Sequence, residues 1–416
     1  MTLLRAEPDW RHAYRDTGAR MQRAAAQSRL ILCGCCTCID RLLTLQQAVP
    51  VLVSSPDPGA MLLGRELLRR AEAGLGGELL WRSAAAATLL AQLDVKSSLG
   101  GTAAQASYAL AQLGAPVLLA VQDRTAEQVA LLYPDILIAT EDRLTRAGAL
   151  IPQHMRGRPP HFIIEYIEGH PVAGVVPPRS TRVIVRFSDD GMDHDPCFIR
   201  ASARLASEAA CGILAGLNAI PDDELAATLA NASALAKSWR TAGLATIHLE
   251  LADFPNASHR QAVITALIGH ITSLGMNYNE LNALLPGAAP VNAKARHLAE
   301  TLNLSRVTIH ADEWALTVTR GDPQREQQAL LAGCLLAANR AAHGRPMIPS
   351  ALPQGASFHL PYPAIAEEDS WYTIACPAPW LPRPASTVGL GDTFVAGTML
   401  MLGRTRGAIQ EESRTP

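Results

Sequence analysis

The chain has 416 residues, 48% of them hydrophobic, and its 36 basic residues nearly balance its 38 acidic ones. This length allows a large buried core, and mixed charge without runs of one sign disfavours a surface that binds nucleic acid. No apolar run reaches the roughly 18 residues of a membrane-spanning helix, and the N-terminus mixes charged and apolar residues too finely for a secretory signal. We therefore expect a cytoplasmic protein that has neither nucleic acid nor a membrane as a partner.

A helix is predicted around residues 8–28, and the stretch LILCGCCTCIDRL (30–42) follows with four of the chain's eight cysteines. Its apolar start predicts a buried strand, on which Cys36, Cys38 and Asp40 would share one face. A structural zinc site usually combines paired ligands from separate segments, and the other cysteines occur singly, so such a site is disfavoured. We expect thiols packed in a core strand, and Asp40 in need of a partner or a ligand.

Helical and strand-like patterns alternate along the next part of the chain. Residues 60–95 have helical spacing, and a helix is predicted from about Thr102 to Leu113, directly after Gly100 and Gly101. Strands are predicted at APVLLAV and DILIAT. This alternation is typical of a doubly wound α/β sheet.

Residues 161–188 have a different pattern, with the β-rich segments HFIIEYI, VAGVV and RVIVRF separated by EGHP and PPRST. Short strands between turn residues predict hairpins. We therefore expect a small sheet beside the main one. The α/β alternation then resumes through IHLELAD, SLGMNYNEL and RVTIHADEWALTV.

Near the C-terminus, a strand predicted at WYTIAC leads through a proline-rich loop to Gly-Leu-Gly-Asp and an apolar helix that begins at about Asp392 or Thr393. Glycines before a helix let backbone N–H groups approach an anion, and the helix dipole adds positive charge there. An aspartate facing that anion needs a chemical task, and removing the proton of a hydroxyl that attacks phosphorus fits. The alternative is an ordinary loop whose aspartate caps the helix.

The segment STVGLGDTF resembles the C-terminal signature of the ribokinase-like superfamily, and in particular of its ADP-dependent glucokinase and phosphofructokinase family. GGTAAQASYALAQLG resembles the glycine pair and helix that hold the phosphoryl acceptor there. IHLELAD and SLGMNYNEL are similar to the family's H-x-E and N-x-x-E segments, and FIIEYIEG and PPRSTRVIV are similar to its lid strands. These segments occur in the family's order over residues 30–396.

The resemblance implies a ribokinase-like, doubly wound α/β sheet flanked by helices, with a smaller β-rich lid domain. The large nucleotide-binding domain would comprise residues 1–40, 101–155 and 188–416, and the lid residues 41–100 and 156–187. The implied activity is transfer of the β-phosphoryl of ADP to a hydroxyl of a sugar or sugar phosphate. An ATP-using kinase of another sugar or nucleoside, or a catalytically idle sugar or nucleotide sensor, are the alternatives. No pattern predicts the oligomeric state.

The resemblance also implies roles for the Gly-Leu-Gly-Asp residues. Asp392 would be the general base, and the backbone of Gly389 and Gly391 would form an anion hole for the transferring phosphoryl. The donor would be ADP, with ATP as the alternative. Trp314 is either a neighbour of the base of the nucleotide or an ordinary core residue.

A magnesium site is implied by the N-x-x-E and H-x-E segments. Glu280 and Asn277 would position Mg²⁺ through water, and Glu250 and His248 would support them from a neighbouring strand end. A solvated strand terminus is the alternative for Glu250, and a hydrogen-bonded core imidazole is the alternative for His248.

The implied acceptor-binding residues come from both predicted domains. The side chain of Glu165 points either toward the sugar or toward solvent, and the two arginines either clamp a phosphate or pair with lid carboxylates. The candidates are Asp40, Gly100, Gly101, Glu165, Arg179 and Arg182.

The acceptor strand departs from the family pattern. The family's first strand typically ends in N-T-N-I-D, whereas this chain has Cys36, Thr37, Cys38, Ile39 and Asp40. A thiol is a poor substitute for an amide as donor and acceptor, so sugar contacts at these positions should be altered or lost. Thr102 and Tyr108 also stand where the family usually has glutamine and often has asparagine. The acceptor is therefore left open.

Overall fold

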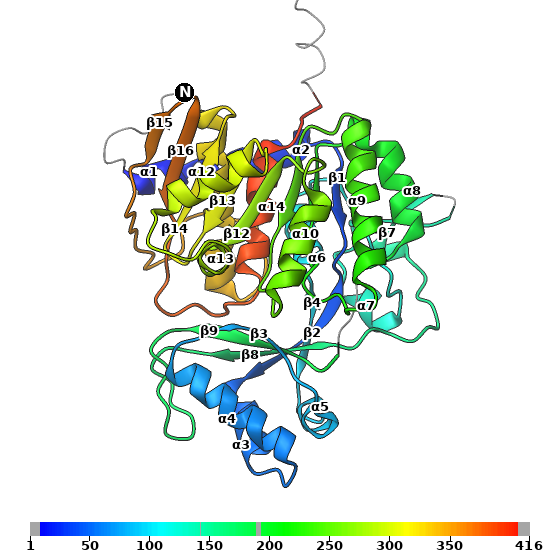
Figure 1. The fold of residues 1–416 in the computed structure, drawn as a ribbon, viewed down its shortest axis with the longest axis vertical. Coiled ribbons are helices and arrows are strands. Elements are labelled where there is room, and N and C mark those ends of the chain that lie inside the picture. The colour runs from blue at the N-terminus through cyan, green and yellow to red at the C-terminus, as the bar shows by residue number, and fades with distance from the viewer. Residues whose placement is uncertain (1–8, 142, 189–192, 407–416) are drawn as a thin grey trace, which may run out of the picture.

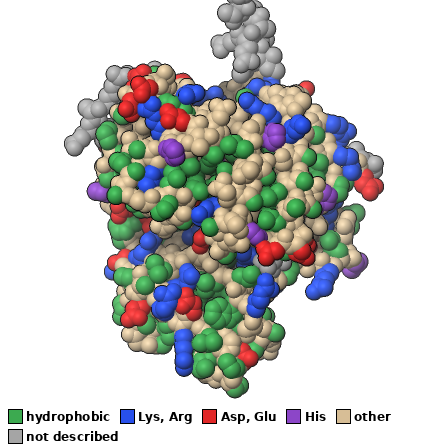
Figure 2. All heavy atoms as spheres, viewed as in Figure 1, with side chains coloured by type: hydrophobic (Ala, Val, Ile, Leu, Met, Phe, Trp, Pro, Cys, Tyr) green, Lys and Arg blue, Asp and Glu red, His purple; other side chains and the backbone are tan. Residues whose placement is uncertain are grey.

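The computed structural model describes residues 9–141, 143–188 and 193–406, and these form two sheets with helices around them (Figure 1). The terminal residues 1–8 and 407–416 of the predicted large domain lie outside this range. Among the described residues, no helix is long and apolar enough to cross a membrane. Basic and acidic side chains are interspersed on the face of the molecule shown in Figure 2.

The large sheet is parallel at its centre and antiparallel at both edges. Its buried central strands are short and apolar, as expected when helices cover both faces. In spatial order within the described residues, the strands are β15 (Ile365–Glu368), β16 (Trp371–Pro377), β14 (Trp314–Thr319), β13 (Arg306–His310), β12 (Ser273–Asn277), β11 (Ile247–Glu250), β10 (Cys211–Leu214), β1 (Ile31–Gly34), β5 (Val117–Leu119), β6 (Leu137–Ala139) and β7 (Leu144–Arg146).

Helices cover both faces of this sheet and create two apolar layers. The first layer is formed by α8 (Pro196–Leu205), α9 (Leu225–Thr241), α10 (Ala257–Leu267), α11 (Tyr278–Leu284) and α12 (Val291–Thr301). The second includes α2 (Thr17–Gln27), α6 (Thr102–Gln112), α13 (Pro323–His343) and α14 (Leu390–Leu402). The other helices around the large sheet, within the described residues, are α1 (Trp10–Arg15), α7 (Ala126–Leu131) and the 3-10 turns η1 (Ala147–Ala149) and η2 (Ala206–Glu208).

The small sheet has its own apolar core against three helices. Its strands, in spatial order within the described residues, are β3 (Gly77–Leu80), β9 (Thr181–Arg186), β8 (His161–Tyr166), β2 (Cys38–Thr44) and β4 (Lys96–Gly100). The helices α3 (Leu45–Val53), α4 (Pro58–Glu72) and α5 (Ala84–Ala91) accompany it. Figure 1 shows α3 and α4 on the side of the small sheet that faces away from the large sheet. The other face of the small sheet is turned toward the large sheet.

The predicted α/β class, with helices flanking a large sheet, is confirmed, and three local predictions are wrong. The region 60–95 is not all helical, because the short strand β3 pairs with β9 from a segment about a hundred residues away. VAGVV forms only an isolated bridge between Val172 and Val175. The stretch LILCGCCTCIDRL contains two strands in different sheets, and Cys35 between them has a φ of 87°.

The helices α13 and α14 pack backbone to backbone at a pair of glycines. A Cβ atom on Gly397 would lie 2.7 Å from the Cα of Gly333 and 2.8 Å from the carbonyl oxygen of Ala332. Since this is backbone rather than a flexible side chain, the helices would have to separate to admit a methyl group. The close approach fixes α14, and therefore the Gly-Leu-Gly-Asp segment at its start, against α13.

We expect Gly397→Ala to lower the free energy of unfolding by about 1–3 kcal/mol, as overpacking of a core commonly does. Urea titration followed by circular dichroism measures this change. Gly321→Ala is the control, because a Cβ there would meet only the Thr319 hydroxyl at 3.2 Å. Equal effects of the two substitutions would contradict tight packing at Gly397.

Candidate active site

The Gly-Leu-Gly-Asp segment forms the N-terminus of α14. Gly389 is in the left-handed conformation with a φ of 67°, and the helix begins at Leu390, two residues earlier than the sequence predicts. Gly391 and Asp392 therefore lie in the first helical turn, where backbone N–H groups have no partner within the helix. The predicted base thus lies beside a helix N-terminus of the kind that binds anions.

The side chain of Arg340, from α13, lies against this turn. It is 3% exposed, and its Nη1 donates a hydrogen bond to the Thr393 hydroxyl at 3.0 Å. A Cβ atom on Gly389 would overlap the guanidinium group, so position 389 requires glycine for space as well as for its backbone conformation. Burial lowers the pKa of Arg340 to about 10, although the negative charge of Asp392 acts to raise it. The guanidinium group therefore stays cationic at neutral pH.

Two neighbouring residues of the small sheet hold the loop that precedes this turn. Glu165 of β8 and Arg182 of β9 are directly opposite each other. Glu165 accepts hydrogen bonds from the Thr387 backbone N–H at 2.7 Å and from the Ser386 hydroxyl at 3.0 Å. Arg182 donates from Nη1 to the Thr387 carbonyl oxygen at 2.8 Å. The two side chains thus grip one residue through both its N–H and its carbonyl.

Arg179 is placed differently from Arg182. Its Nη2 donates to Asp312 at 2.6 Å, in the loop between β13 and β14, and its side chain is 48% exposed. Arg179 is therefore paired with a carboxylate beside the large sheet rather than with a lid carboxylate.

Asp40 reaches the same region from β2. It is 6% exposed, and burial raises its pKa to about 6, with His161 opposing this rise and Asp392 adding to it. A Cβ atom on Gly100 would overlap the Asp40 carboxylate, and one on Gly101, whose φ is 90°, would lie 2.7 Å from the Cys36 carbonyl oxygen. The glycine pair thus lets β4 and α6 approach residues 36–40 closely.

A second group of polar side chains lies at the ends of three neighbouring strands. Glu250 accepts hydrogen bonds from His248 at 2.9 Å and from His310 at 3.0 Å. Burial alone would raise the pKa of Glu250, but the hydrogen bonds from His248 and His310 outweigh it and lower the pKa to about 2. Burial lowers the pKa of His248, against the hydrogen bond to Glu250.

The N-x-x-E segment forms a capping box at the start of α11. Asn277 Oδ1 accepts from the Glu280 N–H at 2.9 Å, and Glu280 accepts from the Asn277 N–H at 2.8 Å. Burial raises the pKa of Glu280 to about 8, against the Asn277 hydrogen bond, and the charge of Glu250 contributes to the rise. Two carboxylates near each other, Glu250 buried and Glu280 half-buried, favour a cation, and their oxygen atoms suit Mg²⁺. These residues therefore fit the predicted ion.

Sequence reasoning missed His310 and Arg340. His310 connects the two groups, because its Cε1 would lie 3.0 Å from a Cβ on Gly391 while its Nε2 bonds Glu250. A signal for it existed, since RVTIH places it at a strand end like Glu250 and Asn277. Arg340 stands in the apolar run LLAGCLLAANRAA, where a lone arginine in a buried helix suggests a buried anionic partner.

The model of the ADP-specific phosphofructokinase/glucokinase conserved region matches residues 63–401. The chain belongs to the ADP-specific phosphofructokinase/glucokinase family. As a member of this family it is a phosphotransferase with a sugar hydroxyl as acceptor and a nucleotide as donor. A search of curated protein sequences gave no match.

Solved structures of ADP-dependent kinases share the fold of this family member at low identity. An ADP-dependent kinase in complex with fructose-6-phosphate and ADPβS has 19% identity and a TM-score of 0.78 over 95% of this chain and 98% of its own. The last common ancestor of ADP-dependent phosphofructokinases from Methanosarcinales has 20% identity and a TM-score of 0.72 over the same shares. A phosphofructokinase from Pyrococcus horikoshii OT3 with AMP has 16% identity and a TM-score of 0.69 over 90% and 98%.

We expect Arg340→Met to slow phosphoryl transfer by about tenfold to a hundredfold, because the turn loses a buried cation beside Asp392. Arg340→Lys should retain part of the rate, since it keeps the charge but not the planar guanidinium. Initial rates with ADP and a sugar phosphate measure the effect. Arg345→Met, at an exposed position just after α13, is the control. An unchanged rate in Arg340→Met would contradict a role for this cation.

Proposed function

We propose that the chain transfers the β-phosphoryl of ADP to a hydroxyl group of a sugar or sugar phosphate, with Asp392 as the general base. The observation that carries this proposal is the position of Asp392 in the first turn of α14, beside Arg340 and electrostatically coupled to Asp40 from the other sheet. A base, an anion-binding turn and an acceptor-side carboxylate are thus brought together.

The residues divide the work of phosphoryl transfer between them. The N–H groups of the α14 terminus, with Gly389 and Gly391 leaving the backbone accessible, offset negative charge on the transferring phosphoryl. Asp392 accepts the proton of the attacking hydroxyl as the bond to phosphorus forms. Asp40 orients the acceptor by accepting hydrogen bonds from its other hydroxyl groups.

The small sheet serves as a lid over this centre. Glu165 and Arg182 act on the acceptor side by fixing Thr387, and with it the turn that receives the phosphoryl. Arg179 holds the edge of the lid to Asp312. Excluding water from the site protects the donor from hydrolysis. The lid domain would comprise residues 41–100 and 156–187.

Magnesium completes the proposed site. Glu280 and Asn277 would hold the ion through water, with Glu250 and His248 in support. When bound, Mg²⁺ neutralises charge on the phosphates of the nucleotide. The ADP and fructose-6-phosphate named for the similar kinase complex support a nucleoside diphosphate as donor and a sugar phosphate as an acceptor worth testing first.

Asp392→Asn should lower kcat by about a thousandfold, within the range for losing general-base catalysis, while ADP affinity changes little. The assay combines ADP, Mg²⁺ and a panel of sugars and sugar phosphates that includes glucose and fructose 6-phosphate, with product read by mass. Asp322→Asn is the matched control, because Asp322 caps the N-terminus of α13 through its side chain. Similar losses in both variants would reduce Asp392 to a capping residue, and no phosphorylated product in the panel would count against the proposed activity.

Glu280→Gln should raise the Mg²⁺ concentration for half-maximal rate by about tenfold, since the variant removes a carboxyl group that would ionise when the cation binds. The rate is measured across a magnesium titration at saturating ADP. Glu300→Gln, at a partly exposed surface position paired with Arg296, is the control. A metal dependence identical to that of the unmodified chain would remove Glu280 from the magnesium site.

A further inference from the structure

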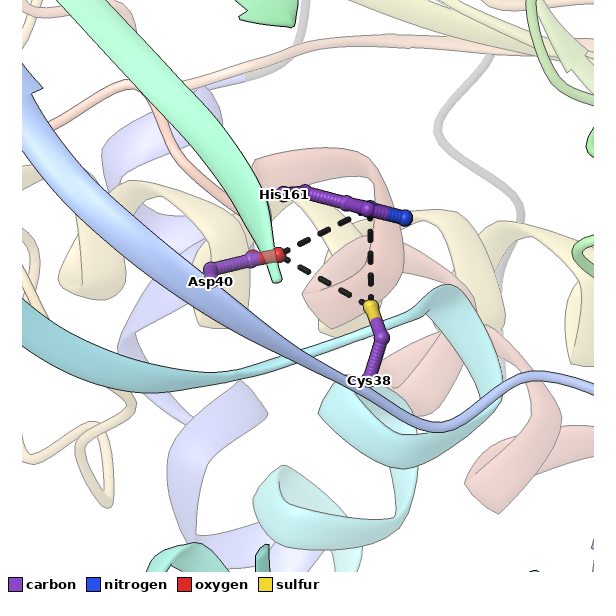
Figure 3. A group of neighbouring side chains, drawn as sticks. All are labelled: Cys38, Asp40 and His161. Carbon is purple, nitrogen blue, oxygen red and sulfur yellow. Dashed lines mark hydrogen bonds and ion pairs between the residues drawn. The ribbon is translucent and has the colours of Figure 1, made fainter. Parts of the chain in front are cut away.

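Three side chains of different chemistry converge on one face of the small sheet. Figure 3 shows Cys38, Asp40 and His161 pointing toward one another, the first two from β2 and the third from β8. The Cys38 Sγ lies 3.6 Å from the His161 Nδ1 and 3.8 Å from the Asp40 Oδ1, and the latter two atoms are 4.0 Å apart. Among the described residues, this is the one group of three or more potential metal-ligating side chains with all ligand atoms within 4.8 Å of one another.

The backbone accounts for this convergence. Cys38 and Asp40 are two residues apart on β2, so their side chains lie on the same face. His161 is the register partner of Asp40 in the parallel pairing of β2 with β8. Gly100 is the register partner of Cys38 on the other side, and a Cβ there would overlap Asp40 and approach the Cys38 sulfur to 2.7 Å. The absence of a side chain at position 100 therefore leaves the group its space.

The spacing is close to that of ligands around a tetrahedral ion. Bonds of about 2.3 Å to sulfur and about 2.0–2.2 Å to nitrogen and oxygen place such ligand atoms roughly 3.3–3.6 Å apart. The 3.6 Å distance from Cys38 to His161 lies within this range, and the distances of 3.8 Å and 4.0 Å to Asp40 exceed it by a few tenths of an ångström, which small side-chain rotations can close. Cys38 and Asp40 are 5% and 6% exposed, and the His161 side chain is 16% exposed, so the ligands are shielded but reachable.

We propose that Cys38, Asp40 and His161 form a binding site for a divalent transition metal of the zinc class, with one coordination position left for water. A thiolate, an imidazole and a carboxylate are a donor set that binds zinc, whereas Mg²⁺ prefers oxygen ligands alone. The ion displaces the thiol proton of Cys38, which leaves for solvent. This open three-ligand site differs from the closed four-ligand structural site that the cysteine spacing disfavours.

Occupancy of the site would act on phosphoryl transfer through Asp40, a step that rests on the proposed function. Asp40 cannot both coordinate the ion and accept hydrogen bonds from a sugar with the same oxygen. The bound ion would therefore compete with the acceptor and inhibit the kinase. The side chain of Asp40 is coupled to Asp392 and Arg340, so the ion would lie on the side of the phosphoryl-transfer centre.

Cobalt binding tests the site without reference to activity. The full chain is treated with a chelator, freed of it under reducing conditions, and titrated with Co²⁺. We expect one thiolate-bound ion per chain, seen as a thiolate-to-cobalt charge-transfer band in the near ultraviolet, which Zn²⁺ removes and excess Mg²⁺ leaves in place. Absence of this band in the unmodified chain would overturn the proposal.

Variants locate the ligands. Cys38→Ser should abolish the band, and His161→Asn should weaken Co²⁺ binding by at least about tenfold. Cys197→Ser is the matched control, because Cys197 is a half-buried thiol on α8 and should leave the band unchanged. A band that survives Cys38→Ser, or that only Cys197→Ser removes, would place the ion elsewhere. Circular dichroism verifies folding, and His161→Asn remains informative if the serine variant does not fold.

Inhibition is tested separately, in the kinase assay. Zn²⁺ should raise the apparent KM for the acceptor without changing the KM for ADP, and a chelator should restore the rate. The Asp392→Asn variant, assayed for cobalt alone, should bind the metal as the unmodified chain does. Metal binding in a chain with no kinase activity would overturn the proposed function and leave the site standing. An active kinase without the cobalt band would overturn the metal site and leave the proposed function standing.

Discussion

The buried guanidinium of Arg340 sets the conditions for the whole centre. A cation at 3% exposure is costly to bury without compensating charge, and the carboxylates of Asp392, Asp40 and Glu165 all act on it. These three residues come from α14, β2 and β8, so balancing one charge requires both sheets to be in place. Arg340 also limits position 389 to glycine, which connects the shape of the anion-binding turn to the charge beneath it.

The parallel sheet explains why the polar groups meet at one edge. β11, β12 and β13 are neighbours in parallel register, so Glu250, Asn277 and His310 all emerge at their carboxyl ends. His310 then extends this edge toward α14, since its ring lies 5.1 Å from that of Phe394 and its Nε2 bonds Glu250. The imidazole of His310 thus contacts both the proposed magnesium residues, through Glu250, and the helix that carries the proposed base.

The fold class, the position of the Gly-Leu-Gly-Asp turn and the family were predictable, because each depends on local patterns such as short apolar strands, glycines before a helix and the N-x-x-E segment. The strand β3 and the role of Arg340 were harder to predict, because both depend on contacts with residues that are distant in the sequence. His161 could not have been joined to Cys38 from sequence at all, since that contact depends on the register of two strands more than a hundred residues apart. The sequence also could not show that the cysteine stretch turns sharply at Cys35 and changes sheets there.

The hydrogen bonds of Glu165 and Arg182 to Thr387 couple the position of the small sheet to the order of the loop before α14. Because Glu165 and Arg182 belong to paired strands, any rigid displacement of the hairpin withdraws both hydrogen bonds from Thr387 together. The residues just before Gly389 would then be released as the small sheet moves away. Displacement of the small sheet would therefore also loosen the turn that we propose holds the phosphoryl group, and hydrolysis of the nucleotide would be disfavoured in that state.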